Sequence, residues 1–83
     1  MGRREETLIQ KILNNPRDVR FIDACKVARI IGFTRERQKR TSHRIFGRPG
    51  EMTILNFQNR KGKIGTYQAE QLILMVRKYW NQS

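Results

Sequence analysis

The apolar residues of this chain have helical spacing near both ends and strand-like spacing in the middle, and this order restricts the folds available to it. We expect helices at residues 4–14, 22–31 and 67–80, and strands at residues 33–37, 42–48 and 52–58. Helices that flank consecutive strands are typical of an α+β fold. The sequence therefore predicts a three-stranded antiparallel sheet with helices packed on one face.

Glycine and proline mark the expected boundaries between these elements. Gly32 follows the second helix, where it can adopt a left-handed conformation at no steric cost. Pro49 and Gly50 predict a hairpin turn between the second and third strands. Phe21 is expected to pack just before the second helix, and Thr66 is expected to cap the last one.

Positive charge is concentrated in the middle of the chain. The 83 residues carry a formal net charge of +11, and residues 35–63 hold nine Lys or Arg against two Glu. A small domain with this balance favours an anionic partner, most often nucleic acid, although an acidic protein or an anionic membrane also fits. A run of cations is otherwise a solvated surface.

The cysteine and histidine content argues against a metal site. Cys25 is the one cysteine and His43 the one histidine, so neither an intrachain disulfide nor a zinc site is expected. The sequence calls for no cofactor. It has neither the apolar core of a signal peptide nor an apolar run long enough to span a membrane, so we expect a cytoplasmic protein with no membrane partner.

His43 lies in the most basic stretch of the chain and is the candidate catalytic residue. Cleaving RNA without a metal needs a base for the 2′-hydroxyl proton and cations that hold the phosphate. His43 can supply the base. Ser42 can donate a hydrogen bond to phosphate, and the candidate cations are Arg40, Arg44, Arg48, Lys61 and Lys63.

A single histidine on a strand is, however, more often a polar surface residue than a catalyst. The second strand alternates His43 and Ile45 with Ser42, Arg44 and Phe46, and this pattern does not tell which set faces the helices. If the helices cover Phe46, His43 points outward, as catalysis requires.

Several short motifs together resemble the HicA family of toxin mRNA interferases. That family has a helix ending in a glycine and an aromatic residue, followed by a Gly-Ser-His motif on the second strand. The later segments look like the third strand, basic loop and last helix of the family. The segments that carry the resemblance are Ile30-Ile31-Gly32-Phe33, Thr41-Ser42-His43-Arg44-Ile45-Phe46, Leu55-Asn56-Phe57-Gln58, Gly62-Lys63 and Tyr67-Gln68-Ala69-Glu70-Gln71-Leu72.

The resemblance implies a fold like the double-stranded RNA-binding domain, α-β-β-β-α, over residues 21–83, with residues 1–20 as a helical extension. It also implies a ribosome-independent endoribonuclease that cleaves mRNA with His43 as its catalytic histidine and is neutralised by a HicB-like antitoxin. The chain departs from the family pattern at two positions. Thr41 replaces the glycine of the motif, and Arg44 replaces a second histidine.

Two other functions are compatible with the same residues. The first is a non-catalytic module that binds double-stranded RNA by its shape and phosphates. The second is one half of a DNA-binding complex, which lacks support because no recognition helix is evident. Cleavage of RNA by the pure protein distinguishes the toxin from both.

Overall fold

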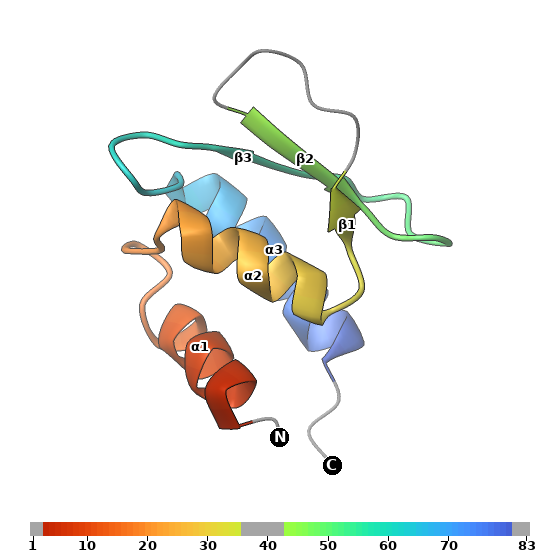
Figure 1. Ribbon diagram of the computed structural model, residues 1–83, viewed down its shortest axis with the longest axis horizontal. Coiled ribbons are helices and arrows are strands. Elements are labelled where there is room, and N and C mark those ends of the chain that lie inside the picture. The colour runs from red at the N-terminus through yellow and green to blue at the C-terminus, as the bar shows by residue number, and fades with distance from the viewer. Residues whose placement is uncertain (1–2, 36–42, 81–83) are drawn as a thin grey trace.

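The computed structural model describes residues 3–35 and 43–80. Figure 1 shows α2 and α3 beneath the sheet, with α1 farther from it. None of the helices in these ranges combines the length and the apolarity that crossing a bilayer requires. The chain has the predicted α+β class, and its elements are α1 (Arg3–Asn14), α2 (Phe21–Ile30), β1 (Thr34–Arg35), β2 (His43–Gly47), β3 (Leu55–Gln58) and α3 (Thr66–Tyr79).

The strands pair in the order β1-β2-β3. β2 and β3 form the main antiparallel pair, in which His43 is opposite Gln58 at one end. β1 pairs with the other end of β2, where Thr34 is opposite Gly47. The sequence predicts this strand at residues 33–37. Within the described residues, β1 consists of Thr34 and Arg35. His43 thus begins β2 at the end away from β1.

The third strand is shorter than the sequence predicts. We expected it to cover residues 52–58, but β3 begins at Leu55. The N–H of Thr53 donates to the side-chain carboxylate of Glu51 at 2.8 Å, so a local hydrogen bond replaces strand pairing there. Met52 is 97% exposed. The place of Met52 in the apolar pattern of residues 52–58 therefore does not mean that its side chain is buried.

The turn after α2 is the left-handed glycine cap that the sequence predicts. Gly32 has a φ of 95°. Its N–H donates to the Arg29 carbonyl at 3.1 Å, and the N–H of Phe33 donates to the Ala28 carbonyl at 2.9 Å. These two bonds form a Schellman motif, which satisfies carbonyl groups at the helix end.

All three helix starts differ from the predictions by one residue, and α1 begins at Arg3 instead of residue 4. Phe21 is the first residue of α2 and is buried, whereas we expected it just before the helix. The N-cap of α3 is Gly65, in an extended conformation and without a side-chain cap, so the predicted cap Thr66 already lies inside the helix. The N–H of Ala69 donates to the Gly65 carbonyl at 2.9 Å, which closes the first turn without help from a hydroxyl.

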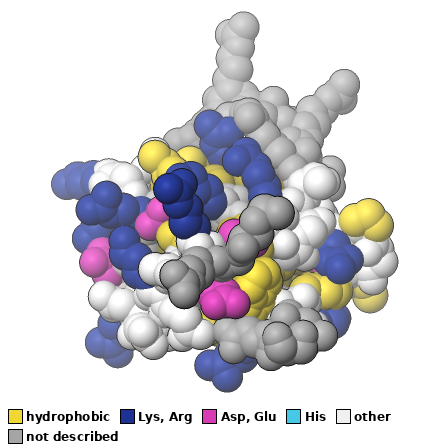
Figure 2. Space-filling view, turned by 60° about the horizontal axis from the view of Figure 1, so that its bottom comes forward, with side chains coloured by type: hydrophobic (Ala, Val, Ile, Leu, Met, Phe, Trp, Pro, Cys, Tyr) yellow, Lys and Arg dark blue, Asp and Glu magenta, His cyan; other side chains and the backbone are white. Residues whose placement is uncertain are grey.

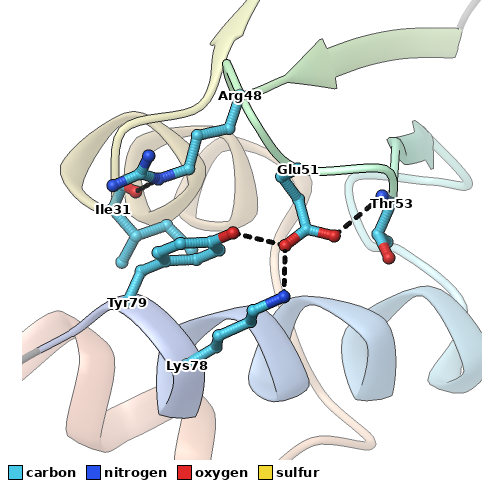
Figure 3. Close-up of polar contacts among 6 residues, drawn as sticks. All are labelled: Ile31, Arg48, Glu51, Thr53, Lys78 and Tyr79. Carbon is cyan, nitrogen blue, oxygen red and sulfur yellow. Dashed lines mark hydrogen bonds and ion pairs between the residues drawn. The ribbon is translucent and has the colours of Figure 1, made fainter.

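A carboxylate ties the β2–β3 connection to α3 (Figure 3). The side chain of Glu51 is 4% exposed and lies 2.7 Å from the Lys78 ammonium. It also accepts hydrogen bonds from the Tyr79 hydroxyl and the Thr53 N–H. The hydrogen bonds from Lys78, Tyr79 and Thr53 lower the pKa of Glu51 to about 2.

One hydrophobic cluster joins the sheet to the helices. Phe46 and Phe57 have no exposed surface, and their ring centroids are 5.8 Å apart. Ile9 and Ile12 of α1 belong to the same cluster. The segment predicted as an extension thus includes a helix, α1, that contributes to the core supporting the sheet.

Candidate functional site

β2 places His43 on the face of the sheet that turns away from the helices. Side chains two positions apart on a strand share a face, and those one apart lie on opposite faces. Phe46 is fully buried in the core, so Arg44 shares the helix-covered face with it. His43 and Ile45 lie on the opposite face, partly exposed. We call this second face the open face of the sheet.

On the open face, His43 is hydrogen-bonded across the strands. Its Nδ1 lies 3.1 Å from Oδ1 of Asn56, an exposed residue of β3. When Nδ1 carries the ring proton, it donates to this amide oxygen, and the lone pair that can accept a proton is on Nε2. An imidazole with one nitrogen fixed by a neighbour is a suitably oriented general base.

A cation is held at the same end of the sheet. Gln58 lies opposite His43, and Arg60 donates to the Gln58 side-chain oxygen from Nε at 3.4 Å and from a terminal nitrogen at 3.3 Å. The backbone N–H of Gln58 donates to the side chain of Gln68 at 3.1 Å. Directly opposite residues on antiparallel strands have Cβ atoms about 5 Å apart. His43, Asn56, Gln58 and Arg60 therefore form one group, which we call the His43 site.

Sequence reasoning did not single out Asn56, Gln58 or Arg60. Asn56 and Gln58 alternate with the buried residues Leu55 and Phe57, and this period of two is the signal that places them on the open face. The signal identifies neighbours of a histidine only once the register of the two strands is known.

Arg44, predicted as a phosphate ligand, lies on the other side of the sheet from His43. Its guanidinium carbon is 5.7 Å from the centroid of the Phe21 ring at the start of α2. With Lys26 and Arg29 of α2 it lines a hollow of 190 Å³. His43 and Arg44, which are neighbours in sequence, thus lie on opposite faces of the sheet.

The loop after β3 packs against the start of α2. The N–H of Phe21 donates to the Gly62 carbonyl at 2.8 Å. A cleft of 450 Å³ lies at this junction, and Lys61 and Lys63 are among the residues that line it. The Lys63 ammonium is 2.6 Å from the Asp18 carboxylate and holds the pKa of Asp18 below its usual value, mainly through their hydrogen bond.

Arg48 lies at the opposite end of β2 from His43. Its Nε donates to the Ile31 carbonyl at 3.2 Å, and its guanidinium carbon lies 4.0 Å from the centroid of the Tyr79 ring (Figure 3). These contacts fasten β2 to the ends of α2 and α3, so the structure does not bring Arg48 into the His43 site. The predicted ligands Arg40 and Ser42 lie outside the described residues.

Positive charge alone does not identify the functional face. Figure 2 views the molecule from the side where α1 lies, and dark blue Lys and Arg side chains are spread over it with a few magenta carboxylates among them. No histidine is visible on that face. The feature specific to the open face is therefore the pair formed by His43 and Asn56.

Within residues 3–35 and 43–80, no three His, Cys, Asp or Glu side chains are grouped so that they could hold a metal ion. Comparisons of the chain with models of protein families, with curated proteins and with solved structures found no match. The candidate site is defined by its own geometry.

Proposed function

We propose that this protein is a metal-independent endoribonuclease that cleaves mRNA, with His43 as its general base. The observation that carries the proposal is the imidazole on the open face with Nδ1 3.1 Å from Asn56 Oδ1. The resemblance of residues 21–79 to HicA toxins supports the same function. It further suggests a fold like the double-stranded RNA-binding domain.

The chemistry follows from the atoms of the His43 site. Nε2 of His43 takes the proton of a ribose 2′-hydroxyl, and the 2′-oxygen attacks the adjacent phosphorus. The bond from phosphorus to the 5′-oxygen breaks, the leaving oxygen takes up a proton, and a 2′,3′-cyclic phosphate remains. Arg60, held by Gln58 opposite His43, stabilises the negative charge that builds on the phosphate oxygens.

The test is RNA cleavage in excess chelator by the wild-type protein and by His43→Gln. We expect the variant to lose at least about 100-fold in rate, because a positioned general base contributes about 10²–10⁴-fold. Arg77→Gln, an exposed change in the last turn of α3, is the matched control and should cleave normally. Undiminished cleavage by a folded His43→Gln protein would refute the proposal.

We further propose that the protein is a cytoplasmic toxin neutralised by a HicB-like antitoxin that covers the open face. Ile45 lies on this face beside His43, and Ile54, just before β3, is 56% exposed, so a partner there has apolar surface to bury. Co-expression with the product of an adjacent small reading frame should yield a complex without cleavage activity. An antitoxin complex that still cleaves RNA at the wild-type rate argues against this role.

A further inference from the structure

One exposed face of α2 combines an apolar residue with cations. Ile22, Lys26 and Arg29 are spaced by four and three residues, which places them on the same side of the helix. All three are exposed, and Ile22 is 65% exposed. A surface that places an exposed apolar side chain beside two cations suits a ligand that has both apolar and anionic parts.

Two hollows meet on this face. The hollow of 190 Å³ lies between α2 and Arg44 of β2, and the cleft of 450 Å³ lies between the start of α2 and the loop after β3. Phe21 and Ile22 line both, so the two hollows are adjacent. We call the two together the α2 groove, and the cations that line it are Arg20, Lys26, Arg29, Arg44, Lys61 and Lys63.

The negative charge next to these cations is already paired. Asp23 lines the cleft, but its carboxylate lies 3.7 Å from the ammonium of Lys11. Asp18 lies 2.6 Å from Lys63. After these pairings the α2 groove keeps a strong excess of positive charge, which attracts an anionic ligand.

The α2 groove leads toward the His43 site. Asn59 lines the cleft and directly follows Gln58, which is opposite His43. Within the same loop, Arg60 reaches back to Gln58 while Lys61 lines the cleft. The loop after β3 therefore connects the groove below the sheet with the end of the open face.

We propose that the α2 groove binds the phosphodiester backbone of a single RNA strand and guides it to His43. This inference rests on the proposed function and names the path of its substrate. The cleft of 450 Å³ is within the range of about 300–1,000 Å³ for small-ligand sites, and the hollow of 190 Å³ is smaller. These volumes suit one or two nucleotides of one strand. Residues 20–29 extend over about 14 Å of helix, and a strand laid along them meets cations from start to end.

The test is the binding of a labelled single-stranded RNA of about 16 nucleotides, made uncleavable by 2′-O-methyl groups, to the full-length protein. The double variant Lys26→Gln/Arg29→Gln should bind at least about fivefold more weakly, and the slope of log affinity against log salt should fall by about 1.4. Arg17→Gln/Arg77→Gln removes two cations that line neither hollow and should bind like the wild type. Unchanged affinity and salt slope in the Lys26/Arg29 variant would overturn the proposal.

A second variant and a second probe keep the conclusion specific. Arg20→Gln/Lys61→Gln removes cations from the cleft of 450 Å³ and should weaken binding of the same RNA to a similar extent. Normal binding by this variant counts against a path that runs through both hollows. The single-strand assignment is also overturned if a duplex RNA of equal length binds more tightly than the single strand and its affinity falls by the same factor in both variants.

These experiments test the ribonuclease function and the α2 groove separately. If the wild type cleaves no RNA but the groove variants still lose affinity for the uncleavable strand, the ribonuclease function fails and the α2 groove stands. If cleavage depends on His43 but both groove variants bind and cleave normally, the ribonuclease stands and the groove fails.

Discussion

Nδ1 of His43 on β2 lies 3.1 Å from Oδ1 of Asn56 on β3, so the one histidine of the chain is oriented by a neutral amide on the adjacent strand. The register of the two strands produces this contact, because Asn56 is opposite Ile45 and diagonal to His43. The pair lies on the open face, while Phe46, Leu55 and Phe57 on the opposite face are buried in the core.

Asn56→Ala should lower the kcat of RNA cleavage about fivefold with little change in KM, because the imidazole loses a hydrogen bond of about 1 kcal/mol that positions it. Asn56→Asp keeps an oxygen acceptor and should restore most of the rate. Steady-state kinetics on a short RNA provide the measurement. A variant that changes KM alone would indicate that Asn56 binds substrate instead of orienting His43.

Glu51 should make the stability of the fold depend on pH in the acid range. Its pKa in the folded protein is lowered from 4.5 to about 2, so the native state favours the ionised carboxylate. This contribution is fully present above pH 4.5 and is lost as the pH falls toward 2. Thermal melts between pH 2 and pH 6 should show a larger decrease in Tm for the wild type than for Glu51→Gln. Equal decreases in the two proteins contradict the role of Glu51.

The ring of Phe57 is fully buried, and its centroid lies 5.8 Å from that of Phe46. Phe57→Ala should reduce the free energy of unfolding by about 3–5 kcal/mol, since it removes a fully buried ring and leaves a cavity. Urea denaturation measures the loss. Tyr67→Ala, at an exposed position of α3 that is 72% accessible, is the control and should cost less than about 1 kcal/mol.

Gly32→Ala should destabilise the protein by about 1–2 kcal/mol. The φ of 95° disfavours any side chain, and an added Cβ would lie 3.1 Å from Nε of Arg48. Gly50→Ala tests the conformational part alone, because Gly50 has a φ of 81° but no atom near the added Cβ. Gly32→Ala should therefore be the more destabilising of the two, and the opposite order would contradict the steric contribution of Arg48.

The local signals in the sequence were sufficient for most elements. The left-handed cap at Gly32 and the turn at Pro49-Gly50, in which the Glu51 N–H donates to the Arg48 carbonyl at 3.0 Å, formed as predicted because both depend on the conformational range of single residues. The predicted start of β3 at residue 52 was wrong, because the carboxylate of Glu51 accepts a hydrogen bond from the Thr53 N–H and forms an ion pair with Lys78 of α3. Such a contact between distant segments leaves no periodic trace in the sequence.

The sequence by itself determined the α+β class, the order of the elements and the position of His43 in a basic strand, because these follow from short-range spacing and residue type. Only the tertiary structure decided which face of β2 the helices cover, and therefore that His43 lies on the open face and Arg44 on the covered one. The cause is the burial of Phe46 against Phe57 and the helices. Once that face is covered, the strand period of two places His43 beside Asn56 and directs Arg44 to the α2 groove.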